Sequence, residues 1–447
     1  MTLELLAWTG LLAVLGLAGW GLFQLRVYLS IGAGYKAKVL GTAWFVSGRR
    51  LDPARAEQVS ADSYWLLRPF SAAVDDQQRS VTVSLAGFHP RTAVWRNGFG
   101  VTLSAGRRPA PLGPAPSSPS PGYAWRTRAG PPEVHRIVNA AFEEPSSRKL
   151  QRTYAIVVAH DGEIVAERYA PGIDPAMPLP GWSMAKSVLS ALVGILVQEG
   201  RLALAQTELL PAWRAPDPRA GITLEDLLRM RSGLRFSETY ANPWSDVLHM
   251  LYDEHDTAAY AASRPLTSTP GAVWSYSSGT SNILSAIVRR AVGEDRYHAW
   301  PRAALFDPLG MASAVLEPDG AGTFVLSSYM VATARDWARY GQLWLEGGRA
   351  DGRNVLSEDW IRFSTTPTKQ SDGRYGAQWW LKLNPEIGGE SAAARAIAAD
   401  AFFAIGHEGQ TLSIVPSKRL VAVRLGASIQ IDTWDQARFV AELQGAL

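Results

Sequence analysis

Ser183 and Lys186 have the residue types and the spacing for nucleophilic catalysis. They stand three positions apart at the start of a run in which Val188, Leu192 and Ile195 recur at helical spacing, and residues three apart on a helix share a face. A serine hydroxyl becomes a nucleophile when a neighbour takes its proton, and a desolvated lysine amine does so when burial lowers its pKa. The pair therefore predicts a Ser-x-x-Lys hydrolase centre.

The spacing alone is not specific. Ser146 and Lys149 have it too, but they stand in a polar stretch beside Pro145 with no apolar helix behind it, which predicts a solvated loop. For Ser183 taken by itself, an N-cap serine on a core helix, with Lys186 reaching solvent, is an equal alternative.

A Gly- and Ser-rich loop over residues 270–282 carries Tyr276 just before an apolar helical run. A phenol in a cationic pocket can lose or relay a proton, so Tyr276 is a candidate general base beside Lys186. The alternative is a turn tyrosine that packs on Trp274.

The stretch 404–416 alternates apolar residues, as a strand does, and contains His407, Gly409 and Gln410. The small Gly409 allows a substrate close to the backbone. The N–H of Gln410, together with the N–H of Ser183 at its helix start, is a candidate oxyanion hole. The alternative for His407 is a strand-end histidine bonded to a backbone carbonyl.

In chain order, the three stretches Ser183-Met-Ala-Lys186, Tyr276-Ser-Ser278 and His407-Glu-Gly409 resemble known motifs. They are similar to the Ser-x-x-Lys, Tyr-x-Asn and Lys-Thr-Gly elements of the serine β-lactamase and penicillin-recognising superfamily, in its class C and esterase-like branch. The resemblance covers residues 130–447. It implies an α+β fold, with an antiparallel sheet flanked by helices, a helical lobe, and the active site between them.

Within that superfamily, residues 238–247 resemble a loop of the nylon-oligomer (6-aminohexanoate-dimer) hydrolases. There a tyrosine at the position of Tyr240 contacts the scissile amide. The resemblance implies that Tyr240, Ser278, His407 and Gly409 bind substrate; an ordinary loop aromatic is the alternative for Tyr240. Asp246 and Asp253 are either attractors of a substrate ammonium or solvated carboxylates.

Two motifs depart from the β-lactamase pattern. His407 and Glu408 replace the Lys and Thr that hold a β-lactam carboxylate, and an inward Glu408 would repel that anion. Ser278 replaces Asn and offers one donor where an amide offers two. The departures predict poor penicillin hydrolysis and leave esters and short linear amides.

The predicted protein is a serine hydrolase that cleaves amide or ester bonds of small linear molecules through an acyl-enzyme on Ser183. Either Lys186 or Tyr276 is the resting base, because a coupled pair titrates as a unit. Two alternatives remain: a membrane-anchored penicillin-binding or sensor protein that acylates slowly or only binds, and a D-amino-acid peptidase acting on cell-wall peptides.

Other chemistries lack sequence support. The region around Ser183 has no Gly-x-Ser-x-Gly elbow, since position 185 is Ala. There is no cysteine and no paired-histidine motif among the seven histidines, so no metal ion or organic cofactor is predicted. The 44 Lys and Arg residues are balanced by 41 Asp and Glu residues, which gives no basic patch for nucleic acid.

The N-terminus predicts a membrane anchor. Residues 5–25 are apolar and uncharged, long enough to cross a bilayer as a helix, and no basic residue precedes them as in a signal peptide. Arg26, Lys36 and Lys38 follow the span, which by the positive-inside tendency favours a cytoplasmic body. The resembling family works outside the inner membrane, so we expect a periplasmic catalytic domain.

The sequence divides into a transmembrane anchor (1–30), a small N-terminal α+β region (31–106), a Pro- and Ser-rich connector (107–130) and the hydrolase domain (131–447). Within the second region, 60–67 is predicted as a short helix and 81–85 and 94–103 as strands. In the hydrolase domain, we expect hairpins over 152–169 and 412–425, a closing helix over 433–447, and a capping box from Thr223 to Asp226.

Overall fold

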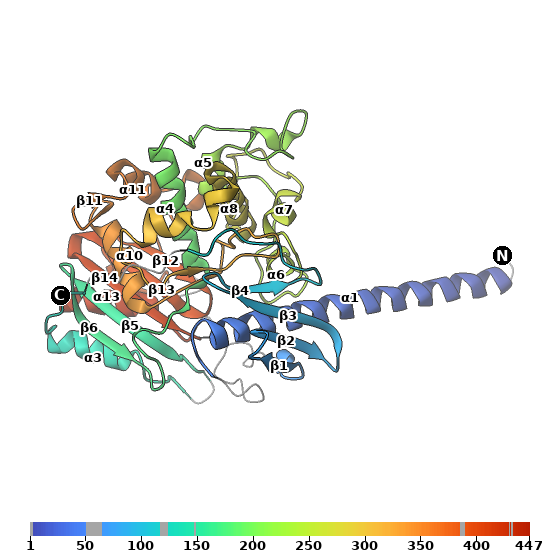
Figure 1. Cartoon of the computed structure of the whole chain (residues 1–447), viewed down its shortest axis with the longest axis horizontal. Coiled ribbons are helices and arrows are strands. Elements are labelled where there is room, and N and C mark those ends of the chain that lie inside the picture. Colours follow the sequence, from blue (N-terminus) through green and yellow to red (C-terminus); the bar gives the residue numbers. More distant parts are fainter. Residues whose placement is uncertain are drawn as a thin grey trace.

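A long N-terminal helix projects from a two-lobed body in the computed structural model (Figure 1). The structure describes residues 3–50, 65–116, 124–146, 149–384, 389–428, 430 and 432–447. Helix α1 is Leu3–Phe45, so the helix predicted over 5–25 continues for another five turns. The predicted boundary at residue 30 falls inside this one helix.

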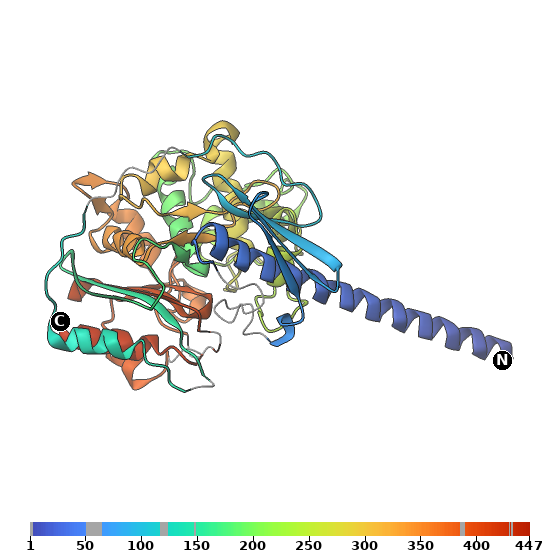
Figure 2. The ribbon, with the colours of Figure 1, turned by 60° about the horizontal axis from the view of Figure 1, so that its bottom comes forward.

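The inner half of α1 is part of the body. From Val27 onward its side chains are mostly buried, and a four-stranded antiparallel sheet packs along it in the order β1-β2-β3-β4. Figure 2 shows this sheet lying along the helix. Its strands are β1 (Ser71–Asp75), β2 (Ser80–Leu85), β3 (Phe88–Arg96) and β4 (Gly100–Ser104). Of the helix predicted over 60–67, residues 60–64 lie outside the described residues and Trp65–Leu67 forms a 3-10 turn.

The outer half of α1 is apolar on all sides and exposed. Trp8, Leu25 and eight large apolar residues between them are each about half exposed or more. The segment Leu3–Arg26 is about 36 Å long at 1.5 Å per residue, enough to cross the hydrocarbon core of a bilayer. Among the described residues, α1 is the one helix whose length and composition suit a membrane span.

The described part of the connector is hydrogen-bonded to the body. Its backbone donates hydrogen bonds from Ala110 to the Gly320 carbonyl (2.7 Å) and from Gly113 to Nδ1 of His298 (3.1 Å). Further along, Arg128 N–H bonds the carbonyl of Ile164 at the edge of the main sheet (3.0 Å). Pro119 and Pro121 lie outside the described residues.

The main sheet has five antiparallel strands in the order β12-β13-β14-β5-β6. Alternate residues of β5 serve two cores: Val157 faces the helical lobe, whereas Ile156 and Val158 face α3 and α13. The turn at Asp161 and Gly162, both with positive φ, closes the predicted hairpin. The strands are β5 (Thr153–His160), β6 (Glu163–Tyr169), β12 (Phe402–Gly406), β13 (Gln410–Val415) and β14 (Leu420–Gly426), and the covering helices are α3 (Pro132–Ala140), α10 (Ala334–Leu345) and α13 (Gln436–Ala446). The predicted antiparallel sheet flanked by helices is confirmed.

The helical lobe lies beside this sheet (Figure 1). Its helices are α4 (Ala185–Gln198), α5 (Leu224–Leu228), α6 (Asp246–Tyr252), α7 (Thr257–Ala262), α8 (Ser278–Val292), α9 (Glu294–Tyr297) and α11 (Glu358–Thr365). The smaller elements are β7 (Leu179–Pro180), β8 (Val315–Leu316), β9 (Met330–Ala332), β10 (Arg349–Ala350), β11 (Arg353–Asn354) and α12 (Ala392–Ala396).

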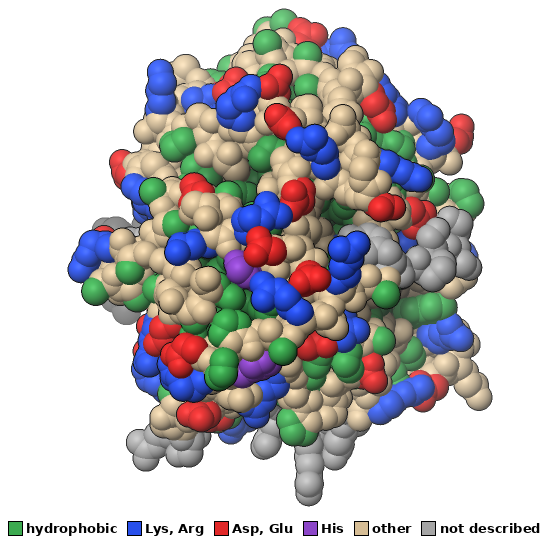
Figure 3. All heavy atoms as spheres, turned by 90° about the vertical axis from the view of Figure 1, so that its left-hand side faces the viewer, with side chains coloured by type: hydrophobic (Ala, Val, Ile, Leu, Met, Phe, Trp, Pro, Cys, Tyr) green, Lys and Arg blue, Asp and Glu red, His purple; other side chains and the backbone are tan. Residues whose placement is uncertain are grey.

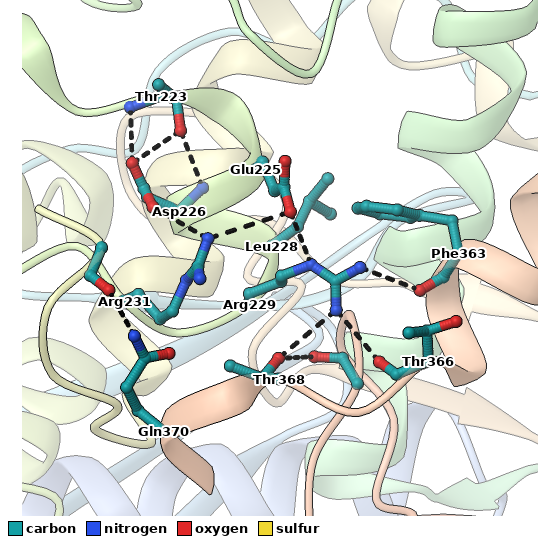
Figure 4. A network of polar contacts seen from close by, with 12 residues as sticks. Thr223, Glu225, Asp226, Leu228, Arg229, Arg231, Phe363, Thr366, Thr368 and Gln370 are labelled. Atoms are coloured by element: carbon teal, nitrogen blue, oxygen red, sulfur yellow. Dashed lines mark hydrogen bonds and ion pairs between the residues drawn. The ribbon is translucent and has the colours of Figure 1, made fainter. Parts of the chain in front are cut away.

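The predicted capping box of α5 is present, since Thr223 Oγ1 accepts from Asp226 N–H and the Asp226 carboxylate accepts from Thr223 N–H. Figure 4 shows this box beside Arg229, whose guanidinium donates to the carbonyls of Phe363 (3.2 Å) and Thr366 (3.0 Å). These contacts hold α5 against the end of α11 within the helical lobe.

Candidate active site

Ser183 lies in a 3-10 turn, Trp182–Met184, that leads into α4. Trp182 has a φ of 49°, a left-handed conformation that costs energy for a bulky residue and is typical of functional turns. Gly181 fits before it because a Cβ there would lie 2.4 Å from the Trp337 ring. The turn places the Ser183 hydroxyl at the cleft while α4 stays buried.

Lys186 is 1% exposed, and its amine reaches three oxygens. Nζ lies 3.0 Å from Ser183 Oγ, 3.0 Å from Ser278 Oγ and 2.8 Å from the Ser327 carbonyl. Burial lowers the pKa of Lys186 to about 8, and the nearby Glu238 carboxylate offsets part of that effect. In its neutral form the amine has a lone pair to accept the Ser183 proton.

Tyr276 is held just before α8, where Ser277 Oγ caps the helix by accepting from Thr280 N–H at 3.1 Å. The Tyr276 side chain lies beside Ser183, and Lys186 Nζ lies 4.9 Å from the centre of its ring. Burial raises the pKa of Tyr276, with a smaller contribution from Glu238. The phenol is therefore protonated at neutral pH.

Ser278 contacts three site residues. Besides accepting from Lys186, its hydroxyl donates to the Glu238 carboxylate and lies beside Tyr240, and its N–H donates to Glu238 Oε2 at 2.8 Å. Burial raises the pKa of Glu238, and the charge of Lys186 counters that rise. Ser278 thus links Lys186 to Glu238 at the position where the Tyr-x-Asn motif has an asparagine.

His407 forms one wall of the site. Its ring stacks on Tyr240, with centroids 4.8 Å apart, and meets Trp182 edge-on at 5.5 Å. Burial lowers the pKa of His407 to about 4, so the imidazole is uncharged at neutral pH. The Glu408 carboxylate is buried and accepts from Tyr35 of α1, behind the cleft wall.

Gly409 lines the cleft with a φ of 80°, and a Cβ there would lie 2.6 Å from Nη1 of Arg424. Arg424 is fully buried and holds this loop by donating to the Glu408 and Gly409 carbonyls at 3.2 and 2.9 Å. Gln410 lies behind the wall, where its side-chain amide closes a pair of hydrogen bonds with Gly426 at 2.6 and 2.9 Å. The part of Gln410 N–H in an oxyanion hole stays a prediction.

The cleft in front of these residues has a volume of about 660 Å³. Aromatic rings form much of its lining: Tyr240, Tyr276, Trp380 and Trp434. Of the described residues that line it, none is Lys or Arg. The described part of the chain also brings together no group of three His, Asp or Glu residues suited to a metal ion.

Sequence reasoning missed three contributors. Glu238 is the first residue of a loop motif and has no predicted role of its own. Ser327 contributes a backbone carbonyl, which no motif marks. Arg424 lies inside a strand. A lone charge in the apolar run 420–425 was the available signal for Arg424.

Asp246 and Asp253 are structural rather than solvated. Asp246 accepts from Ser237 and Tyr260, and Asp253 pairs with Arg91.

A two-lobed α+β fold with a Ser-Lys-Tyr cluster in the cleft, around a buried lysine, is that of a β-lactamase-like protein. The chain belongs to the Beta-lactamase family, whose profile matches residues 138–428.

Several proteins that the chain is similar to are named as hydrolases. The chain is 28% identical over 348 residues to 6-aminohexanoate-dimer hydrolase of Paenarthrobacter ureafaciens, covering 70% of this chain and 84% of that protein. Two solved structures share the fold. One, from Bacillus anthracis and provisionally named a 6-aminohexanoate-dimer hydrolase, has a TM-score of 0.58 at 22% identity, covering 73% and 87% of the two chains. The other, a family VIII carboxylesterase, has a TM-score of 0.52 at 16% identity, covering 72% and 99%.

Proposed function

We propose that this protein is a serine hydrolase that cleaves esters and linear amides, including aminohexanoate dimers, through an acyl-enzyme on Ser183. The observation that carries the proposal is the cluster of Ser183, Lys186 and Tyr276 at the wall of an aromatic cleft, with Lys186 Nζ 3.0 Å from Ser183 Oγ. The hydrolase names of its relatives are consistent with it.

In the proposed reaction, neutral Lys186 accepts the Ser183 proton while Oγ attacks the carbonyl carbon. Lys186 is the better resting base because its pKa is lowered toward neutrality, whereas the pKa of Tyr276 is raised. The proton on Lys186 then reaches the leaving amine or alkoxide by relay through the Tyr276 hydroxyl, which takes up one proton as it gives up another. The N–H groups of Ser183 and Gln410 are the proposed oxyanion donors, and water releases the acyl group.

The lining of the cleft argues for substrates without a charge near the scissile bond. His407 is neutral, and the described lining offers no Lys or Arg to pair with the carboxylate beside a β-lactam ring. In an aminohexanoate dimer, a pentamethylene chain separates each charged end from the amide. We infer that Tyr240, His407, Ser278 and Gly409 contact such chains, with Tyr240 bonding the leaving amine.

The test is turnover of a short p-nitrophenyl ester, a linear aminohexanoate dimer and a chromogenic cephalosporin. We expect ester or dimer hydrolysis that falls by at least about 10⁴-fold in Ser183→Ala. Ser146→Ala is the matched control, because Ser146 has the same spacing to a lysine, Lys149, in an exposed loop. Turnover that survives in Ser183→Ala refutes the mechanism; no turnover by folded protein favours a binding or sensor role.

We also propose that α1 anchors the protein in the inner membrane with the body on the periplasmic side. The chain has no cysteine, so a single Asp359→Cys substitution at an exposed position of α11 reports on sidedness. Labelling of intact cells by a maleimide that crosses the outer but not the inner membrane is the expected result. Labelling only after lysis places the body in the cytoplasm.

A further inference from the structure

Apolar and basic side chains gather where α1 leaves the body. Phe88, at the tip of the β2–β3 hairpin, is 68% exposed, and Leu66 is 41% exposed. Single exposed apolar residues are ordinary on a soluble surface. Phe88 and Leu66 differ because both lie where the exposed apolar segment of α1 joins the body.

Contacts between α1 and the sheet fix the position of the tip. Ser30 of α1 is hydrogen-bonded to Arg91 near the start of β3, whereas Gly41 lies against Ala93 and Val101. Strand β3 therefore begins beside the part of α1 that leaves the body. Figure 1 shows the sheet ending level with that point.

Leu66 lies at the same place. Its carbonyl accepts from the Tyr28 hydroxyl at 2.6 Å, and the Tyr28 ring meets Phe70 edge-on at 5.7 Å. Tyr28 is two residues beyond Arg26, the last residue of the exposed segment.

Exposed arginines lie at the same end of the body. Arg26 ends the apolar segment of α1, and Arg68 stands two residues after Leu66. Strand β4 ends at Ser104, paired with Thr92, so the following Arg107 and Arg108 also lie at this end.

The described acids here are fewer and half-buried. Asp253 is paired with Arg91, and Glu254 has Arg107 nearby. The opposite face of the body, seen in Figure 3, carries interspersed basic and acidic side chains instead.

We propose that this end of the body is a second membrane contact, in which Phe88 enters the interfacial layer and the four arginines bind anionic lipid headgroups. The proposal rests on α1 being a membrane anchor. Amphipathic surfaces that combine an aromatic residue with arginines favour the headgroup boundary, where the arginines are attracted to anionic lipid. The contact would fix the tilt of the body, and so of the cleft, relative to the bilayer.

The absence of cysteine allows a direct test in the full chain. A polarity-sensitive fluorophore is attached to Phe88→Cys, to Leu17→Cys in the anchor, or to Asp359→Cys on α11, and each protein is placed in nanodiscs with or without phosphatidylglycerol. We expect the label at 88 to shift to the blue and to be quenched by nitroxide-bearing lipid when phosphatidylglycerol is present. The label at 359 should show neither effect.

Removing positive charge separates the two parts of the proposal. Arg107→Gln with Arg108→Gln should reduce the shift and the quenching at 88, whereas the matched pair Arg349→Gln with Arg353→Gln, on the distant β10–β11 turn, should not. Equal insertion with and without phosphatidylglycerol refutes headgroup binding. A label at 88 that stays in water while the label at 17 is quenched refutes the second contact, and no quenching at 17 refutes the anchor itself.

Discussion

Tyr35 of the N-terminal helix donates a hydrogen bond to Glu408 Oε1 at 3.2 Å, behind the wall of the cleft. The Tyr35 ring also lies parallel to that of Trp182, with centroids 6.4 Å apart and planes 8° apart. Trp182 precedes Ser183, and Glu408 follows His407. The inner half of α1 thus supports both the turn that holds Ser183 and the third motif.

Tyr35→Ala should therefore lower both stability and turnover. Loss of a buried aromatic ring costs about 3–5 kcal/mol, and without it the Trp182 turn loses its packing partner. Tyr35→Phe keeps the ring and loses the hydrogen bond, at a cost of about 1 kcal/mol. The measurements are the thermal midpoint in detergent and kcat/KM for the ester. Wild-type turnover in a folded Tyr35→Ala protein would show that α1 only carries the domain.

The pH dependence of kcat/KM should report Lys186. The neutral amine is the proposed base, so activity should rise with pH and level off above an apparent pKa of about 8. Below that value the rate should fall about tenfold per pH unit, because the ammonium form cannot accept the Ser183 proton. Tyr276→Phe should lower the plateau by about 10²- to 10⁴-fold, while the limb, the rising part of the pH profile, keeps its midpoint near pH 8. A limb that disappears in Tyr276→Phe would instead assign the base to the tyrosine.

Glu238→Gln should move the same limb to lower pH. The carboxylate raises the pKa of Lys186, so replacing it with a neutral amide of similar shape leaves burial unopposed. The expected displacement is about one pH unit. Glu225→Gln, which removes an acid from the helical lobe outside the cleft, is the control and should leave the limb in place. An unmoved limb in Glu238→Gln would mean that Glu238 is protonated throughout the range.

The sequence predicted those parts of the site that depend on local patterns. Ser183 and Lys186 share a helix start, and Tyr276 precedes a capped helix, so three chemical groups were visible in the order of the chain. Much of the five-stranded sheet could also be predicted, because apolar residues alternate along β5 or make up most of β14.

The rest depends on contacts between distant segments. Glu238 reaches Lys186 from a loop with no periodicity, and its importance comes from burial that only the packed lobes create. By the positive-inside tendency Lys36 and Lys38 favour a cytoplasmic body, yet both are buried: Lys36 donates to the Phe70 carbonyl (2.9 Å), and Lys38 pairs with Glu317. A charge that finds its partner 279 positions away gives no local signal.

That buried pair leads to the last prediction. Lys38 and Glu317 are 3% and 2% exposed, and Glu317 Oε1 also accepts from Val101 N–H at 2.7 Å and from Thr42 Oγ1 at 3.0 Å. Lys38→Met leaves the carboxylate buried without its counter-charge, so the free energy of unfolding should fall by about 3–5 kcal/mol.

Replacing both partners should recover most of this loss, because Lys38→Met with Glu317→Leu leaves no unpaired charge. The matched control is the exposed pair of Arg362 and Asp359, where Arg362→Met should cost less than about 1 kcal/mol. Denaturant unfolding in detergent, followed by tryptophan fluorescence, gives all three values. If Lys38→Met is no more costly than Arg362→Met, the inner half of α1 does not fold as one unit with the catalytic body.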